Sequence, residues 1–302
     1  MNFLISLIMA ENAYQLDQAA AASEAARRVD AHVQILYADN DAITQSQQLL
    51  NVIQSSSAGS RPDAIVCHPV GTTLRQVAHE AMARGIGWAL LNRKDNYLAE
   101  LQRMNQPPSF CVTVDQEEVG RIQGRQFGAL LPRGGLVLYI LGPSTNPVFN
   151  QRTTGMESTK PRNIQITTLR GNLTEQSGHD AVTSWLKLRT SRMTPVSLVA
   201  GQNDNMAIGA RKAFEETLSG EERERWSTLP YTGCDASPRA GQEWIRKGLL
   251  RASIFLPPTA GVAIETMAQA IQTKKQPHLC KQLIPASYPP VENLRKERQE
   301  NS

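Results

Sequence analysis

The sequence is poor in the features that mark several large classes of protein. No apolar run reaches the roughly 18 residues that a membrane-spanning helix needs, so we expect no membrane insertion. The formal net charge of the 302 residues is only +4, and the basic residues are interspersed with acidic ones rather than gathered in a stripe. Because nucleic acid is bound through clustered positive charge, it is not an expected partner.

The motifs of common enzymes and metal proteins are also missing. The histidines show no metal-ligand spacing, and neither a phosphate-binding loop nor a GxGxxG dinucleotide motif occurs. The segment GPSTN lacks the glycine that follows the serine in a nucleophile elbow. Carboxylates are present, but no nucleophile and base pair accompanies them. We therefore predict a protein that is not an enzyme and that uses neither a metal nor a cofactor.

Cysteine is scarce as well. The sequence has four cysteines and no CxxC pair: Cys67, Cys111, Cys234 and Cys280. Three of them lie in apolar, strand-like runs, and the clustered partners that a zinc site needs are absent. We interpret all four as buried free thiols. Oxidising compartments disfavour spare thiols, so this interpretation favours an intracellular protein.

The sequence does contain a regular alternation of apolar runs and helical patterns. The first run, FLISLIM at 3–9, is typical of a strand buried on both faces. Further strands are predicted at 33–37, 63–67, 88–91, 110–114, 136–141, 164–169, 196–200, 229–234 and 252–256. Helices are predicted at 16–29, 41–54, 73–84, 116–131, 150–159, 174–188, 204–218, 238–247 and 259–273. This alternation predicts parallel sheets made of right-handed βαβ units.

About ten strands are too many for one sheet, and a chain of this length suits two lobes. We predict an α/β protein with two lobes, each a parallel sheet flanked by helices, joined by three hinge crossovers around a ligand cleft. The N-terminal lobe takes 1–114 plus 257–284, and the C-terminal lobe takes 115–256 plus 285–302. The glycines of GRIQGRQFG recur every fourth residue, which predicts close helix packing, and the charged tail ENLRKERQENS is interpreted as a solvated end.

Polar residues follow nearly every predicted strand, at the edge where ligands of such sheets bind. They are Glu11, Asn12, Tyr14, Asn92, Arg93, Asp115, Asn146 to Arg152, Asn172, Gln202, Asn203, Asp204 and Asp235. Helix N-caps account for part of this set, because Asp and Asn side chains bind free amides there. Capping does not account for Tyr14, Arg93 or Arg152, whose planar groups suit hydrogen bonding and ring stacking. We expect Asn203 to cap the 204–218 helix and to face a ligand as well.

The segment QNDNMAIGARKAF, residues 202–214, resembles the xND-x-MA-x-GA-x-x-A segment of the type 1 periplasmic binding protein superfamily. This superfamily includes ribose-binding proteins and the effector domains of LacI-type repressors. The segments VDQEEVGRIQGRQFGALL, YTGCDASP and ASIFLPP resemble further parts of the same superfamily, in the right order. The resemblance extends over nearly the whole chain, and it implies two lobes that close on a ligand.

In ribose-type members, polar side chains hold the hydroxyl groups of a pyranose between aromatic rings. The resemblance implies that the ligand-binding residues here are Asn12, Tyr14, Asn92, Arg93, Arg152, Asn203 and Asp235, with Glu11, Asn172 and Leu256 as candidate further contacts. Several positions depart from the family pattern. Asn92 replaces an Asp, Leu256 replaces the Gln of ribose binders, and Leu173 or Asn172 stands where a ring is usual. Gln15 stands where a second Phe is common, so we expect a sugar or similar polar molecule other than ribose.

The resemblance implies reversible binding with hinge closure, in the solute-binding component of a transporter or sensor system. Its protein partner would be a membrane permease or a sensor kinase. The alternative is a cytoplasmic metabolite-sensing or regulatory effector domain that lacks a DNA-binding module, since the first strand begins at residue 3. The apolar start MNFLISLIMA lacks the basic leader and cleavage site of a signal peptide. We expect a cytoplasmic protein as the sequence stands, and a periplasmic one if an upstream export signal has been removed.

Overall fold

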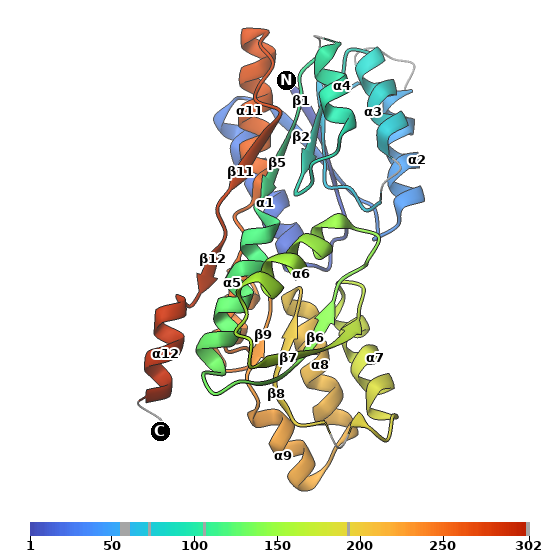
Figure 1. Ribbon diagram of the computed structural model, residues 1–302. Coiled ribbons are helices and arrows are strands. Elements are labelled where there is room, and N and C mark those ends of the chain that lie inside the picture. The colour runs from blue at the N-terminus through green and yellow to red at the C-terminus, as the bar shows by residue number, and fades with distance from the viewer. Residues whose placement is uncertain (55–60, 72–73, 105–106, 192–193, 300–302) are drawn as a thin grey trace. The chain divides into compact units, whose positions relative to one another are not determined.

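The structure is a computed structural model that describes residues 1–54, 61–71, 74–104, 107–191 and 194–299. The chain divides into two compact units, Met1–Val114 with Pro257–Leu283 and Asp115–Leu256 with Ile284–Ser302. Each unit contains a parallel sheet flanked by helices, which confirms the predicted α/β architecture (Figure 1). Most of the loop expected at 55–62, the first residue of the helix expected at 73–84, and the last three residues of the chain lie outside the described residues.

The first unit is built on a six-stranded sheet in the order β11-β5-β4-β3-β1-β2, with every neighbouring pair parallel. Its strands are β1 (Asn2–Leu7), β2 (His32–Tyr37), β3 (Ala64–Cys67), β4 (Gly87–Leu91), β5 (Ser109–Val114) and β11 (Cys280–Leu283). Its helices are α1 (Ala13–Arg28), α2 (Ala42–Ile53), α3 (Leu74–Ala83), α4 (Tyr97–Arg103) and α11 (Thr259–Thr273).

Strand β1 shows why its sequence is apolar almost throughout. Phe3, Ile5 and Leu7 point to one face of the sheet and join an apolar cluster with side chains of α1 and α11. Leu4 points to the opposite face and joins a second cluster with side chains of α2, α3 and α4. Even Ser6 is buried, and its hydroxyl accepts a hydrogen bond from a glutamine of α2 at 3.0 Å. Since helices cover both faces, the ends of the strands are the part of this sheet that a ligand can reach.

The second unit has a four-stranded parallel sheet in the order β7-β6-β8-β9 and a separate antiparallel pair, β10-β12. Its strands are β6 (Gly135–Leu141), β7 (Ile164–Arg170), β8 (Val196–Gly201), β9 (Tyr231–Thr232), β10 (Ser253–Phe255) and β12 (Ala286–Tyr288). Its helices are α5 (Gln116–Leu130), α6 (Pro147–Thr159), α7 (Glu175–Leu186), α8 (Asp204–Thr217), α9 (Gly220–Thr228), α10 (Gly241–Arg246) and α12 (Val291–Gln299).

Helices α5 and α6 pack too closely for side chains at their facing glycines. A Cβ on Gly120 would lie 2.0 Å from the carbonyl oxygen of Arg152, and one on Gly155 would lie 2.0 Å from that of Glu117. Gly124 is closed in similarly by the end of α6. The close packing predicted for the GRIQGRQFG segment is therefore confirmed. One consequence is that Arg152 is fixed against the first turns of α5.

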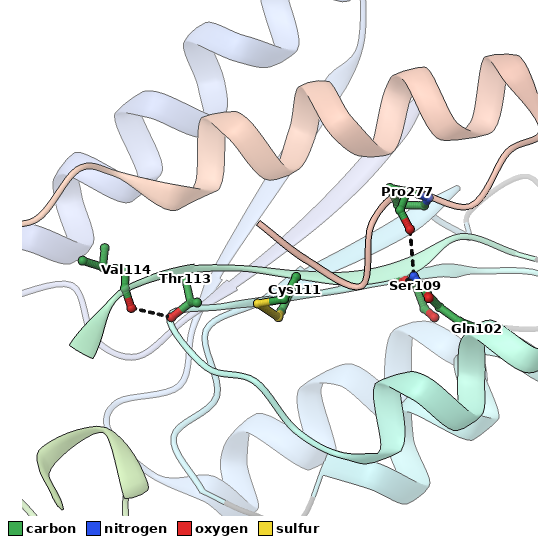
Figure 2. Close-up of a disulfide and its surroundings, with 7 residues drawn as sticks. Gln102, Ser109, Cys111, Thr113, Val114 and Pro277 are labelled. Atoms are coloured by element: carbon green, nitrogen blue, oxygen red, sulfur yellow. Dashed lines mark hydrogen bonds between the residues drawn. A yellow bond between two sulfur atoms is a disulfide. The ribbon is translucent and has the colours of Figure 1, made fainter. Parts of the chain in front are cut away.

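Two of the four cysteines are not free thiols. Cys111 on β5 and Cys280 on β11 form a disulfide across this parallel pair (Figure 2), whereas Cys67 and Cys234 are free and buried. The prediction of four free thiols was wrong for the bonded pair. The two residues are 169 positions apart, and nothing in the sequence indicated that the short segment CKQL would form a strand beside β5.

The charged tail is not simply a solvated end. Residues Val291–Gln299 form α12, and Leu294 is fully buried in an apolar cluster that also contains Phe127 and Leu130 of α5. The interpretation as a solvated end was wrong for this stretch, because Leu294 and the partly buried Val291 anchor a largely polar helix. The sequence reading also missed α4, α9, β11 and β12, and it overestimated the lengths of β9 and α10.

Candidate functional site

Tyr14 and Asn92 form a hydrogen-bonded pair at the carboxyl edge of the first unit's sheet. Tyr14 lies in the first turn of α1, and Asn92 follows β4 with a φ of 56°, a region that asparagine enters more readily than most residues. Asn92 Nδ2 donates to the Tyr14 hydroxyl oxygen at 3.0 Å, and Thr259 Oγ1 donates to Asn92 Oδ1 at 3.4 Å. Both side chains of the pair are buried. Groups from α1, α11 and the end of β4 thus meet at one place.

Arg93 lies next to this pair in sequence and is fixed by two acceptors. Its Nη1 donates to the carbonyl oxygen of Gly71 at 2.9 Å, and its Nε donates to Asp95 Oδ1 at 3.0 Å. The guanidinium is buried, and Asp95 also partly neutralises its charge. An arginine held in this way keeps its remaining N–H donors in fixed directions.

The residues that follow β1 differ in role. Asn12 caps α1, because its Oδ1 accepts a hydrogen bond from the backbone N–H of Gln15 at 3.2 Å. Glu11 beside it is exposed. The side chain of Gln15 accepts from the N–H of Ile8 at 3.1 Å, and its Nε2 lies 3.1 Å from His68 Nδ1. Where the family commonly has an aromatic ring, this chain therefore has an amide that links the ends of β1 and β3.

Gln202, at the end of β8, connects three segments of the second unit. Its Oε1 accepts from the N–H of Gly142 at 2.8 Å, and its Nε2 donates to the Phe149 carbonyl oxygen and to Thr153 Oγ1, both at 3.0 Å. The Gln202 carbonyl oxygen accepts from Arg152 Nη1 at 2.6 Å. We did not predict Gln202 as a ligand contact, and its satisfied, fully buried amide gives it a positioning role.

Arg152, on α6, is a second anchored guanidinium. Besides the bond to Gln202, its Nε donates to Gln116 Oε1 at 2.9 Å, and its Cζ lies 5.4 Å from the centroid of the Phe149 ring. The side chain is buried. Within the described part of the chain, Nη2 makes no hydrogen bond, so it remains a fixed donor for another acceptor.

Asn203 caps α8, as predicted. Its Oδ1 accepts from the N–H of Met206 at 2.9 Å, and its Nδ2 donates to the carbonyl oxygen of Leu173 at 2.7 Å. Leu173 has a φ of 66°. Asn172 before it is exposed. Asn203 thus joins the end of β8 to the loop after β7.

Asp204 is fully buried and fixes the loop that follows β9. Its Oδ1 accepts from Ser253 Oγ at 2.5 Å, its Oδ2 accepts from the N–H of Ala236 at 2.8 Å, and its own N–H donates to the Cys234 carbonyl oxygen at 2.7 Å. Burial raises the pKa of Asp204 to about 6, although these hydrogen bonds and the charge of Arg152 favour the ionised form. Asp204 therefore positions its neighbours rather than a ligand.

Asp235 lies in the loop that Asp204 holds. It has a φ of 128°, and its backbone bridges to β10 through the N–H to the carbonyl oxygen of Ile254 at 3.0 Å. The N–H of Leu256 donates to the Asp235 carbonyl oxygen at 3.3 Å, so this buried leucine lies beside Asp235 as well. Asp235 as a residue is half-buried.

The predicted residues therefore form two groups, one in each unit. Asn12, Tyr14, Asn92 and Arg93 lie at the carboxyl edge of the first unit's sheet, and Arg152, Asn203 and Asp235 lie at that of the second. In both groups a buried guanidinium is fixed by neighbouring acceptors. These are groups that bind hydroxyls or carboxylates, and neither group contains a nucleophile with an adjacent base.

The sequence model of the periplasmic binding protein domain matches residues 3–275. The chain belongs to this family. The resemblance read from QNDNMAIGARKAF and the other three segments is thereby confirmed at the level of the family. No curated protein matches the sequence.

Solved periplasmic binding proteins share the fold. An ABC transporter periplasmic solute-binding protein from Actinobacillus succinogenes with bound D-allose is 20% identical, with a TM-score of 0.80, and the match covers 98% of this chain and 99% of that one. A solute-binding protein from Bacillus halodurans with bound myo-inositol is 19% identical, with a TM-score of 0.78 and coverage of 98% and 96%. The fructose-binding periplasmic domain of a hybrid two-component system is 16% identical, with a TM-score of 0.77 and coverage of 99% and 95%.

Periplasmic binding protein domains are solute-binding modules, and they typically act in the periplasm. Among the described residues, no helix is both long and apolar enough to cross a bilayer. Over the same residues, no group of three or more His, Cys, Asp or Glu side chains is placed to hold a metal ion. The site of this family member is therefore best described by its hydrogen-bonding groups.

Proposed function

We propose that the protein reversibly binds a sugar or a similar polyol between its two units, which close on the ligand where the chain passes from one unit to the other. The proposed contacts are Asn12, Tyr14, Asn92, Arg93, Arg152, Asn203 and Asp235, with Glu11, Asn172 and Leu256 nearby. The observation that carries the proposal is the guanidinium of Arg152. Two hydrogen bonds hold it in place, and its Nη2 is left as an unused donor within the described residues.

The chemistry of the two edges fits vicinal hydroxyl groups. Each hydroxyl donates one hydrogen bond and accepts others, so guanidinium, carboxamide and carboxylate groups can satisfy adjacent hydroxyls together. A hydrogen bond to a charged group contributes roughly 1.5–3 kcal/mol. Micromolar affinity corresponds to a binding free energy of about −8 kcal/mol, which three or four such bonds can supply. Arg93, Arg152 and Asp235 supply the charged groups.

The edges offer little aromatic surface for stacking. Tyr14 is the one ring among the proposed contacts, and it is buried, with its hydroxyl engaged by Asn92. The resemblance implies rings at two further positions, where this chain has Gln15 and either Leu173 or Asn172. We therefore propose a ligand recognised chiefly through hydrogen bonds, such as a small aldose, a furanose or an inositol. Relatives of this fold crystallised with D-allose and myo-inositol make these compounds the first to test.

A thermal-shift panel of pentoses, hexoses, inositols and nucleosides tests the proposal. A compound that binds only the folded protein stabilises it and therefore raises Tm. At a ligand concentration of 100 times Kd, the free energy of unfolding increases by about 2.7 kcal/mol. Titration calorimetry on each positive compound then gives Kd. If no sugar or polyol in the panel shifts Tm, the proposed function is wrong.

Asp235→Asn tests the site. This change keeps the shape of the side chain but removes its charge, so Kd should rise about 10- to 100-fold. The matched control is Asp180→Asn on the exposed face of α7, which should bind as the wild type does. Equal affinity of the wild type and Asp235→Asn would remove Asp235 from the proposed contacts.

We further propose that the protein delivers its ligand to a membrane permease, or reports it to a sensor kinase, from the periplasm. The Cys111–Cys280 disulfide supports an oxidising compartment. The alternative of a cytoplasmic effector domain rested on the absent export signal and on four free thiols, and two of those four cysteines are bonded. Fractionation of cells that express the full gene would test this: recovery of the protein in the cytoplasm would favour the effector role.

A further inference from the structure

The chain passes between its two units at three crossovers. In chain order they lie at Val114–Asp115, Leu256–Pro257 and Leu283–Ile284. A hydrogen-bonding side chain that is not charged follows the first crossover at Gln116 and the second at Thr259, each within three residues. The three residues after the third crossover are isoleucine, proline and alanine, whose side chains form no hydrogen bonds. The first two crossovers can therefore be linked to the proposed site in a way that the third cannot.

Gln116 links the first crossover to Arg152. Its Oε1 accepts a hydrogen bond from Arg152 Nε at 2.9 Å, and both side chains are buried. Gln116 is the first residue of α5, whose N-terminus is capped by Asp115. Before the crossover, the N–H of Asn92 donates to the carbonyl oxygen of Val112 on β5 at 2.8 Å. The first crossover is thus bonded to a proposed ligand contact on each side.

Thr259 links the second crossover to Asn92. Its hydroxyl has two acceptors, Asn92 Oδ1 at 3.4 Å and Gln18 Oε1 at 3.3 Å, and all three side chains are buried. Gln18 Oε1 also accepts from a backbone N–H in the first turn of α11 at 2.8 Å, which fixes the start of that helix on α1. Before the crossover, the N–H of Leu256 donates to the Asp235 carbonyl oxygen at 3.3 Å. The second crossover is therefore also bonded to a proposed contact on each side.

The direction of the Arg152 guanidinium depends on Gln116. Among the described residues Arg152 has two acceptors, Gln116 Oε1 and the Gln202 carbonyl oxygen. Two bonds fix a planar guanidinium, whereas one bond leaves it free to turn about that bond. Because Gln116 follows the crossover directly, its position depends on the backbone of the crossover. The direction in which Arg152 Nη2 points should therefore depend on that backbone too.

We propose that Gln116 and Thr259 are positioning residues, which hold the ligand contacts Arg152 and Asn92 on the first and second crossovers. The same backbone that bends when the units close then aligns the groups that meet the ligand. Closure and affinity are linked in this way, since the ligand stabilises the conformation in which its contacts are aligned. The inference rests on the proposed sugar binding, but its first test needs no ligand.

The first test follows the Nε–H proton of Arg152 by NMR, in ligand-free protein labelled with ¹⁵N-arginine. Arg152→Lys identifies the signal by its loss. We expect exchange of this proton with water to be about tenfold faster in Gln116→Met, which removes the acceptor but keeps the approximate shape. Gln116→Glu restores an acceptor oxygen and should restore slow exchange. Equal exchange rates in the wild type and Gln116→Met would overturn the proposal.

The second test measures Kd for a sugar that binds the wild type. Gln116→Met should raise Kd about tenfold, and Gln116→Glu should stay within about threefold of the wild type. In an Arg152→Lys background, Gln116→Met should have no further effect, because the lysine does not bond Gln116. A loss of the same size in both backgrounds would show that Gln116 acts by another route, and it would contradict a positioning role. Urea unfolding confirms that each variant is folded.

The other two crossovers complete the comparison. Thr259→Val removes the hydroxyl and should raise Kd about threefold, whereas Thr259→Ser keeps the hydroxyl and should bind as the wild type does. Ile284→Ala, at an exposed position of the third crossover, is the control and should leave Kd unchanged. A loss with Ile284→Ala as large as that with Gln116→Met would mean that any change at a crossover weakens binding, and the proposal would fail.

The two tests separate this inference from the proposed function. If no sugar binds the wild type, the proposed function is wrong, and the ligand roles of Gln116 and Thr259 are wrong with it. The exchange rates of Arg152 still show in that case whether Gln116 holds the guanidinium. If sugar binds the wild type and Gln116→Met equally well, the proposed function stands and the positioning role fails.

Discussion

At the scale of single residues, each of the three polar residues after β8, Gln202 to Asp204, has a different structural role. Gln202 links α6 to the ends of β6 and β8, Asn203 caps α8, and Asp204 holds the loop after β9. Arg152 is fixed by this network and keeps one nitrogen unused within the described residues. The network therefore sets the positions of the proposed ligand contacts before any ligand arrives, which lowers the entropy that binding must overcome.

The buried carboxyl of Asp204 should make stability depend on pH. Its pKa is raised from 3.8 to about 6 by burial, so the folded protein holds a proton that the unfolded chain releases. This contribution to stability is complete below about pH 4 and is lost as the pH rises through 6, a change of about 3 kcal/mol. In urea unfolding between pH 4 and 7, the wild type should lose most of this amount relative to Asp204→Asn.

The comparison with Asp204→Asn is needed because other carboxylates change the stability with pH in the opposite direction to Asp204. The pKa of Asp41 is lowered by hydrogen bonds from Thr44, and it loses its contribution as the pH falls. Asp204→Asn can keep both hydrogen bonds, since an amide oxygen accepts from the Ala236 N–H while its NH₂ donates to Ser253 Oγ. Parallel pH profiles of the two proteins would show that Asp204 does not titrate in this range.

Arg152→Lys should separate anchoring from ligand binding. A lysine has one compact ammonium, which can reach the Gln202 carbonyl oxygen but cannot also bond Gln116 and present a fixed second nitrogen. We expect the ligand Kd to rise at least about tenfold and stability to fall by about 1–3 kcal/mol. Calorimetry and urea unfolding measure the two effects. Arg162→Lys, at an exposed position before β7, should change neither.

At the scale of elements, the contact between α5 and α6 depends on the absence of side chains. Gly120→Ala would place a methyl group 2.0 Å from the Arg152 carbonyl oxygen, so the helices must separate. The gain in helix propensity, about 1 kcal/mol, cannot offset this, and we expect a net loss of about 3 kcal/mol. Gly128→Ala meets only the side chain of Pro161, at 3.0 Å, and should be nearly neutral. Equal stabilities of the two variants in urea would contradict the close packing.

Elements with a strong hydrophobic period could be predicted from the sequence, and those placed mainly by contacts with distant segments could not. β1 and β6 are apolar on both faces, and their runs are unmistakable. β11 has only Cys280 and Leu283 as apolar residues, and Leu294 is the one fully buried side chain among the described side chains of α12. Each of these two elements is placed by tertiary contacts that a local pattern does not contain, namely the disulfide with β5 and packing on α5.

The same limit applies to the candidate site. The order of the elements was enough to predict that Arg93 follows a strand and that Arg152 lies near the start of a helix. The roles of Gln202 and Asp204 could not, because the same residue types cap helices, link loops and bind ligands. The hydrogen-bond partners of each side chain determine its role, and those partners lie up to 60 residues away in sequence.

At the scale of the whole molecule, the proposed function requires the two units to close on a ligand. A compact chain of this length has a radius of gyration of about 19 Å, and an open two-unit form should exceed that value. A ligand that touches both units binds the closed state better. Small-angle scattering should therefore show the radius of gyration decreasing toward the compact value when ligand is added to saturation. Asp235→Asn, compared at equal occupancy, should show a smaller change. A radius that stays constant at full occupancy would mean that binding occurs within one unit alone.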